Sequence, residues 1–255
     1  MYEAVMMAAT GLTNQQRRID SIADNVSNVN TVGYKAARLD FKDALYTAGM
    51  GPTASPDGNL QKGHGVMISS ISKQFSQGGL LTTGEELDFA IDGEGFLEVR
   101  APSGELLYTR AGNLYVGQAG DRSYLVNSQG YFVQNNLGER INVPEGTTSI
   151  GVGEDGAITF TAGDWTATDR FGLYTFVNKT GLSAAGNGNY EITVASGQKQ
   201  TSPEIRIKQG ALEASNVELA TEMTRLIRAQ RAFSLAGRAL TTADDMEGIA
   251  NNLKR

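Results

Sequence analysis

Glycine and proline are confined almost entirely to the middle of this 255-residue chain, and that distribution limits where long helices can form. Of the 31 glycines, 27 lie between residues 49 and 210, together with all five prolines. The flanking segments contain only Gly11, Gly33, Gly237 and Gly248. Because glycine and proline are the poorest helix formers, the two ends can support long helices, whereas the middle favours turns between short strands.

Charge follows the same division. Residues 1–48 carry five basic and five acidic side chains, residues 211–255 carry six of each, and the middle, with 11 basic against 17 acidic, holds the whole net charge of −6. A chain with no basic block is a poor candidate for binding nucleic acid or an anionic membrane surface. The absence of cysteine excludes a disulfide framework, a zinc–thiolate site and a cysteine nucleophile.

The N-terminal sequence does not predict membrane insertion. Its longest apolar run covers residues 4–9, far short of the roughly 20 residues that span a bilayer. Glu3 precedes this run, where a cleavable signal peptide would carry lysine or arginine. We therefore expect a protein that stays in the cytoplasm or is exported without a cleaved signal peptide.

Apolar residues recur every seven positions near each end of the chain, which is the heptad pattern of helices that pack lengthwise. The N-terminal series is Val5, Leu12, Ile19 and Val26, with Ile22 three residues after Ile19. The C-terminal series is Leu219, Leu226, Phe233 and Leu240, joined by Met223. The first helix is predicted to end near residues 28–33, and the second to run from about Val217 to Leu253, with Ser215 and Glu218 as a capping box.

The middle of the chain reads as short strands. Runs of β-branched and aromatic residues alternate with turn pairs such as Asp92-Gly93 and Asp155-Gly156. The predicted strands are residues 96–99, 123–126, 131–133, 157–160, 173–177, 190–194 and 204–207. Their number and spacing favour a small antiparallel barrel or sandwich. Residues 49–80 are looser and favour an extended arm or hairpin.

The predicted fold is therefore α+β, with paired long N- and C-terminal helices, coiled-coil-like, flanking a mainly antiparallel β domain. We assign residues 1–33 and 214–255 to a terminal helical domain, 34–80 to an extended arm or hairpin linker, and 81–213 to the central β domain. Two interpretations of the helices remain open. In the first, the two helices pair with each other and close a single domain. In the second, they are stabilised mainly by helices of other copies, because the polar residues Gln15 and Glu222 interrupt their narrow apolar rows.

No catalytic, cofactor-binding or metal-binding residues emerge from the sequence, so we expect no enzyme and no cofactor. His64 is a single loop histidine without a nucleophile motif around it. Residues 88–96 lack the ligand spacing of a calcium loop and fit a turn into a strand. The G-x-G-x-x-G of residues 151–156 leads into a strand, whereas phosphate binding would need a helix. A pair of carboxylates that meets only in the folded chain stays open.

Three stretches resemble the bacterial flagellar axial proteins, the rod, hook and hook-junction subunits. In residues 24–35, their N-terminal signature N-N-x-A-N-x-x-T-x-G-(F/Y)-K is matched by Asn25, Asn28, Thr31, Gly33, Tyr34 and Lys35. Asp24 and Ser27 depart from it. Residues 87–96 with 108–112 are similar to the opening of the family's β domain. Residues 215–233, including Gln230 and Arg231, are similar to its C-terminal helix.

The resemblance implies a structural, self-assembling subunit of the flagellar basal body. Its terminal helices would form the inner layers of a hollow helical tube and its β domain the outer layer. Such a rod transmits torque through the periplasm and passes exported subunits, and its partners are further copies and other flagellar rod and hook subunits. Export uses the flagellar type III apparatus without cleavage. The heptad residues above would then form the assembly interface.

The length and residues 173–182 look most like the distal-rod subunit, but proximal-rod members share the same motifs and hook subunits are usually longer. Two other classes stay open. One is a cell-wall hydrolase carried on a rod-like scaffold, which needs two converging acids within residues 85–210. The other is an adhesin or tip protein that polymerises through the same helices.

Overall fold

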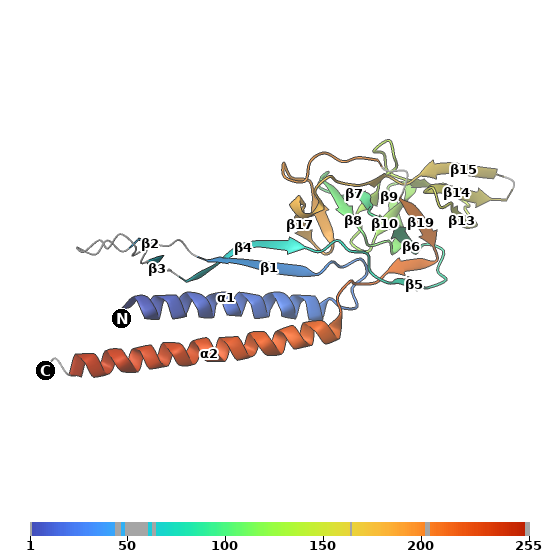
Figure 1. Cartoon of the computed structure of the whole chain (residues 1–255). Coiled ribbons are helices and arrows are strands. Elements are labelled where there is room, and N and C mark those ends of the chain that lie inside the picture. The colour runs from blue at the N-terminus through green and yellow to red at the C-terminus, as the bar shows by residue number, and fades with distance from the viewer. Residues whose placement is uncertain are drawn as a thin grey trace. The chain divides into compact units, whose positions relative to one another are not determined.

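The computed structural model describes residues 2–43, 47–48, 61–62, 65–163, 165–201 and 205–252. The chain divides into two compact units (Figure 1). The helical unit comprises residues 1–27, 37–72 and 218–255, and the β unit comprises residues 28–36 and 73–217. Two helices combined with mainly antiparallel strands confirm the predicted α+β class.

The helical unit consists of two helices and a hairpin. Helix α1 (Tyr2–Ser27) and helix α2 (Leu219–Asn252) pack side by side (Figure 1). Strand β1 (Ala37–Asp43) pairs with β4 (Val66–Lys73), and β2 (Thr47–Ala48) pairs with β3 (Gln61–Lys62). The buried Asn14 of α1 donates to the carbonyl oxygen of Val66, which joins the helix to the hairpin. Neither described helix has an apolar stretch long enough to cross a membrane.

Helix α2 begins later than predicted. Glu222 N donates to Glu218 O at 3.0 Å, and the helix starts at Leu219. The hydroxyl of Ser215 accepts from Val217 N at 3.3 Å, so it caps a short turn and not the helix. The reason lies just upstream, where Asn216 is held within the β unit. Its Oδ1 accepts from Ala36 N at 2.8 Å and its Nδ2 donates to Gln74 O at 2.7 Å.

The β unit is built on one large antiparallel sheet. The strand order is β12-β10-β11-β7-β8-β18-β17, with β16 on β7 and β9 on β10. Strands β13, β14 and β15 form a separate sheet, β19 pairs with β6, and β20 pairs with β5. The bounds are β5 Leu80–Thr82, β6 Phe89–Asp92, β7 Phe96–Arg100, β8 Leu106–Thr109, β9 Leu114–Ala119, β10 Arg122–Asn127, β11 Phe132–Val133, β12 Asn142–Val143, β13 Ser149–Val152, β14 Ala157–Ala162, β15 Trp165–Arg170, β16 Leu173–Tyr174, η1 Lys179–Gly181, β17 Ser183–Gly186, β18 Asn189–Glu191, β19 Arg206–Gln209 and β20 Ala211–Glu213.

Strand β7 separates two hydrophobic clusters, because successive side chains of a strand point to opposite faces. Leu97 and Val99 belong to the larger cluster, together with Leu125 and Ile158 from other strands. Phe96 belongs to the smaller one, which is mostly aromatic and consists of Phe96, Tyr108, Tyr174, Phe176, Leu182 and Tyr190. Both faces of β7 are therefore buried, which gives the unit a true core.

Predicted strands 96–99, 123–126 and 157–160 are confirmed within β7, β10 and β14. Residues 190–194 form a strand only as far as Glu191. The chain turns at Thr193, because Ser196 N donates to Thr193 O and the Thr193 hydroxyl donates to Gly181 O at 2.5 Å. Local side-chain hydrogen bonds of this kind compete with strand pairing, and an alternating sequence pattern does not reveal them.

The stability of the β unit is expected to fall as the pH rises above about 10. Burial raises the pKa of Tyr108 and of Tyr190 above the usual value of 10.0. In this range unfolded tyrosines lose their protons while the folded ones keep them, so rising pH favours the unfolded chain by about 1.4 kcal/mol per pH unit for each tyrosine. Urea unfolding between pH 9 and 11.5, roughly bracketing the tyrosine pKa, measures this slope.

Tyr190→Phe isolates one of the two groups. It should reduce the loss of unfolding free energy by about 1.4 kcal/mol per pH unit, which is the contribution of one tyrosine proton. The matched control is Tyr115→Phe, because Tyr115 is 53% exposed and should leave the slope unchanged. An unaltered slope in Tyr190→Phe would contradict the assignment.

Candidate assembly surfaces and the signature clamp

The signature begins at the end of α1, where Asn25 fastens the helix to strand β1. Its Nδ2 donates to Ala37 O at 2.9 Å, and its Oδ1 accepts from Ala37 N at 2.8 Å. The side chain is almost fully buried. An asparagine can satisfy both backbone groups of one residue because its amide carries a donor and an acceptor.

The next signature residues form a turn and a small apolar cluster in the β unit. Thr31 N donates to Asn28 O, and the Thr31 hydroxyl donates to Asn28 Oδ1, both at 3.1 Å. Tyr34 packs in a cluster with Ala36 and Val217. The ammonium group of Lys73 lies 4.5 Å from the centre of the Tyr34 ring, close enough for a cation–π contact.

Gly33 is required by the close approach of a second segment. Its φ is +67°, and an added Cβ would lie 2.7 Å from both Arg110 C and Ala111 N. Its own N–H donates to Glu213 O at 2.8 Å. The chain that enters the β unit and the chain that leaves it are thus hydrogen-bonded to each other at this glycine.

Gly33→Ala is expected to destabilise the β unit by about 2 kcal/mol or more, since it adds a backbone clash to the strain of a positive φ. Gly120→Ala is the matched control, because Gly120 has the same φ of +67° and open space around the added Cβ. Urea unfolding of both variants separates the clash from the strain. Equal losses of unfolding free energy in the two variants would show that the close approach at Gly33 does not contribute to the destabilisation.

Lys35 ends the signature and lies in a buried cluster of charges. Its Nζ is 2.6 Å from Glu213 Oε1 and donates to Ser76 O at 2.7 Å. Arg110 Nε is 2.7 Å from Glu213 Oε2. Lys35 and Glu213 are fully buried, and the Arg110 side chain is 2% exposed. We call Gly33, Lys35, Arg110 and Glu213 the signature clamp.

The clamp is electrostatically demanding because it places two cations around one carboxylate. Burial lowers the pKa of Lys35 below its usual value, the charge of Arg110 lowers it further, and Glu213 opposes both. Backbone groups satisfy the remaining capacity. Arg110 donates to Gly95 O at 2.8 Å and to Gly93 O at 2.9 Å, and Gly78 N donates to Glu213 Oε1 at 2.8 Å. Such a satisfied network holds a unique arrangement of the segments it joins.

Sequence reasoning placed Arg110 in a family stretch without giving it a role, and it missed Glu213. Glu213 lies 103 residues from Arg110 and 178 residues from Lys35 along the chain. Nothing local distinguishes these charges from those on the surface. The glycine and lysine of the signature were visible in the sequence, but their partners were not.

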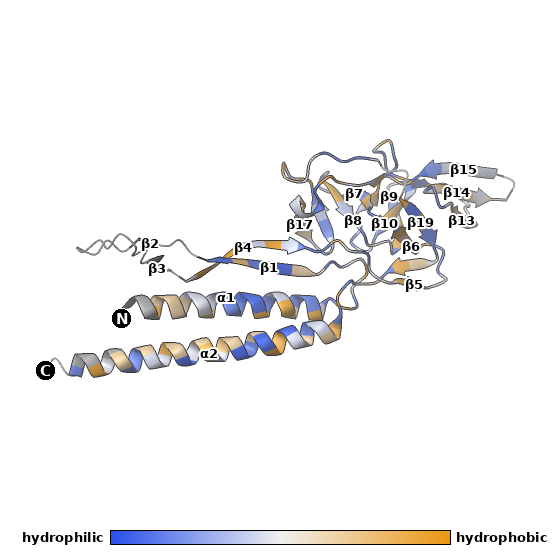
Figure 2. Ribbon diagram, viewed as in Figure 1, coloured by the Kyte–Doolittle hydropathy of each residue, from blue (hydrophilic) through white to orange (hydrophobic). Residues whose placement is uncertain are grey.

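The predicted interface residues divide by exposure. Ile22 is buried, and Val5, Leu12, Ile19, Val26, Leu226 and Leu240 are half-buried. Leu219, Met223 and Phe233 are exposed, at 45%, 42% and 37%. Figure 2 shows hydrophobic residues along both helices. Among the side chains of α2 whose burial is described, the buried ones are the small or acidic Glu222, Ala229 and Ala243.

Helix α2 therefore has an apolar surface that is uncovered in the single chain. We call it the outer stripe, and its members are Leu219, Met223, Ile227, Phe233, Leu235, Met246 and Ile249. Gln230 and Arg231 of the family stretch are also exposed on this helix. Within the described residues neither side chain has a hydrogen bond. Exposed apolar surface of this extent on a helix is typical of an interaction site.

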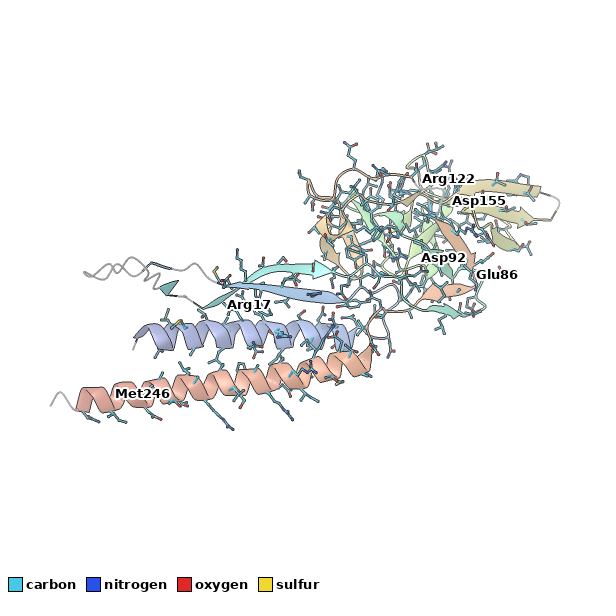
Figure 3. The ribbon with its side chains drawn as sticks, in the orientation of Figure 1. Arg17, Glu86, Asp92, Arg122, Asp155 and Met246 are labelled. Carbon is cyan, nitrogen blue, oxygen red and sulfur yellow. The ribbon has the colours of Figure 1, made fainter. Side chains whose placement is uncertain are left out.

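The two sequence motifs considered for calcium and phosphate binding contain turns next to strands. Gly93, after Asp92, has a φ of +99° where β6 ends. Residues 151–156 comprise the end of β13 and the turn that joins it to its antiparallel partner β14, with Gly156 at φ +79°. Asp155 lies exposed in that turn (Figure 3), where a hydrogen bond from Ala157 N lowers the pKa of its carboxyl. His64 lies outside the described residues. Among the side chains that are described, no three His, Asp or Glu are grouped to hold a metal ion.

Comparisons with known proteins agree on one family. A family model described as "Flagella basal body rod protein" matches residues 7–35, "Flagellar hook protein FlgE/F/G D1 domain" matches 90–160, and "Flagellar basal body rod FlgEFG protein C-terminal" matches 208–253.

Individual relatives match over the whole length. The flagellar basal-body rod protein FlgG of Borreliella burgdorferi is 38% identical, with 100% of both chains covered. The protein of the same name from Agrobacterium fabrum is 37% identical, covering 98% of this chain and 99% of the relative. The flagellar hook-basal body complex protein FlhP of Bacillus subtilis is 31% identical, again with 100% of both chains covered. The family is structural and not enzymatic, and this chain belongs to it, as a member of the flagellar basal-body rod and hook proteins.

Proposed function

We propose that this protein is the distal-rod subunit of the bacterial flagellum and that its copies assemble into a hollow helical shaft. The observation that carries the proposal is the outer stripe, in which seven large apolar side chains among the described residues of α2 are uncovered in a single chain. Apolar side chains exposed along a helix are removed from water when another helix packs against them. Further copies of the same chain would supply such helices.

The helices are proposed to form the assembly domain. On this view α1 and α2 pair in a coiled-coil-like manner through their half-buried heptad residues, while Leu219, Met223 and Phe233 contact other copies. The assignment of residues 1–33 and 214–255 to this domain, 34–80 to an arm and 81–213 to the β domain belongs to the same proposal. A contact between different patches of identical copies generates a helical filament when its rotation does not close into a ring.

The role of the shaft follows from the family. It would transmit torque from the motor towards the hook, pass exported subunits through its lumen, and contact other rod and hook subunits at its ends. Export through the flagellar type III apparatus into the periplasm without a cleaved signal peptide is part of the same proposal. The flagellar basal body is the corresponding location.

The choice of the distal rod rests on the relatives. The FlgG proteins of Borreliella burgdorferi, Agrobacterium fabrum and Bacillus subtilis align over 98–100% of this chain at 33–38% identity. A proximal-rod or hook-type member is the alternative. We favour it less because the hook-basal body complex protein FlhP is 31% identical to this chain, which is below the identity of these FlgG proteins. The cell-wall hydrolase is not supported, because the family is structural.

A helical reconstruction of assembled protein by electron cryomicroscopy tests the proposal. We expect α1 and α2 to line a central lumen, with the outer stripe of one copy against a helix of another. Filaments in which the outer stripe faces solvent would contradict the interface. A protein that stays monomeric at all concentrations in which relatives assemble would contradict the function.

A further inference from the structure

A polar groove in the helical unit lies beside the start of α2. Its volume is about 560 Å³, and residues of α1, β1 and α2 line it. Its charged and hydroxyl side chains are Arg18, Ser21, Arg38, Asp40, Glu222 and Arg225. Because every lining residue belongs to the helical unit, the groove is a property of that unit alone.

Glu222, which lines this groove, has a buried carboxylate oxygen that lacks a hydrogen-bond donor among the described residues. The residue is 3% exposed, and its Oε1 accepts from Arg225 NH1 at 2.5 Å. Its Oε2 is buried and has no hydrogen-bond partner among the described residues. A buried charged oxygen without a donor is costly, so a donor brought in from outside would be bound favourably.

The other charges restrict which donor fits. Arg38 Nε lies 3.1 Å from Asp40 Oδ1. The Arg18 guanidinium lies 5.9 Å from the centre of the Phe41 ring. Three arginines against two carboxylates already leave the lining formally positive. A further cation would add to that charge, and a carboxylate would repel Glu222. An amide is neutral and offers both a donor for Glu222 and an acceptor for Arg18.

Gln230 is the amide that α2 presents to solvent between large apolar side chains. Met223 and Ile227 precede it by seven and three residues, Phe233 follows by three, and all three are exposed. These spacings place them on the same side of the helix. Gln230 lies eight residues from Glu222, roughly 12 Å along the helix axis, so it cannot reach Glu222 of its own chain.

We propose that Gln230 of one copy enters the groove of a second copy, donates its amide N–H to Glu222 Oε2 and accepts from Arg18. The inference rests on the proposed self-assembly and specifies its contact. The amide and the groove are different patches of one surface, so each added copy leaves one of each unfilled, as growth of an open filament requires. A single polar contact within an apolar helical interface fixes its register.

Exchanging the two groups tests the contact. Gln230→Glu places two carboxylates against each other and should raise the concentration needed for assembly about tenfold or more. The double variant Gln230→Glu with Glu222→Gln restores an acid–amide pair in the opposite sense and should assemble within about threefold of the unaltered protein. Sedimentation of the full-length chain measures both, and circular dichroism verifies that the variants are folded.

Arg231→Gln is the matched control, since it changes the adjacent exposed residue and should leave assembly unchanged. The inference is overturned if Gln230→Glu assembles normally, or if the double variant assembles no better than Gln230→Glu. It is also overturned if Arg231→Gln weakens assembly as much as Gln230→Glu does. Failure of the unaltered protein to assemble would instead count against the proposed function itself, and the two failures are therefore distinguishable.

Cross-linking gives an independent readout, because the chain contains no cysteine. Ser21 lines the groove, so Ser21→Cys and Gln230→Cys, made in separate chains and mixed, should form an intermolecular disulfide during assembly. Ser103→Cys in an exposed turn of the β unit replaces Ser21→Cys in the control mixture. No disulfide in the first mixture, or equal yields in both, would contradict the contact.

Discussion

Leu226→Glu and Leu12→Glu are each expected to abolish assembly and motility while the β unit stays folded. Both leucines are half-buried on the helices of the helical unit, and the change would place a carboxylate in an apolar contact. Burying an unpaired charge costs about 3 kcal/mol or more, which would disrupt the pairing of α1 with α2 on which the proposed assembly domain depends. Sedimentation of the purified protein and swimming of a complemented strain measure the two effects.

Two further variants separate the contact between copies from the packing within one chain. Met223→Glu changes a side chain that is 42% exposed in the single chain, so a loss of assembly there reports the outer surface of α2. Thr224→Glu, at the next and also exposed position, is the control and should assemble. Normal polymerisation of Leu12→Glu and Leu226→Glu would remove the interface assignment.

Glu213→Gln is expected to destabilise the β unit by about 3–5 kcal/mol, because it leaves Lys35 and Arg110 as buried cations without their shared anion. Domains of this size are stable by only about 5–15 kcal/mol, so the loss is large. The single tryptophan, Trp165, lies in β15 of the same unit, and its fluorescence during urea unfolding reports the change.

Arg170→Met provides the comparison for this loss. Arg170 pairs with Asp155 on the surface, where both side chains are more than half exposed, and such pairs contribute little to stability. No measurable loss is expected. If Glu213→Gln behaves like Arg170→Met, the signature clamp is not a determinant of stability.

The heptad pattern was sufficient to predict both helices, since a repeat over several turns depends on local sequence alone. It could not assign a partner to each apolar residue. Leu219 and Phe233 continue the same series as Leu226 and Leu240, yet the first two are exposed and the other two half-buried. Periodicity identifies the face of a helix, whereas the packing of α1 decides which part of that face is covered.

The clamp was predictable only in part. The resemblance marked Gly33 and Lys35, but the reason for both lies in Arg110 and Glu213, which reach them through the folding of the β unit. Strand predictions succeeded where side chains alternate across a core, as at β7. They overran where Thr193 turns the chain by bonding its own neighbours.

The ion pair between Lys35 and Glu213 joins residues that are 178 positions apart, and with the hydrogen bond from Gly33 to Glu213 it closes the chain between them into a loop. The entropy of closing a loop grows only with the logarithm of its length, so doubling this stretch would cost about 0.6 kcal/mol. That is small beside the loss expected on breaking the clamp. Loop closure therefore sets little limit on the length of the β unit, and chain inserted into one of its exposed turns would add little to that cost while the clamp remains intact.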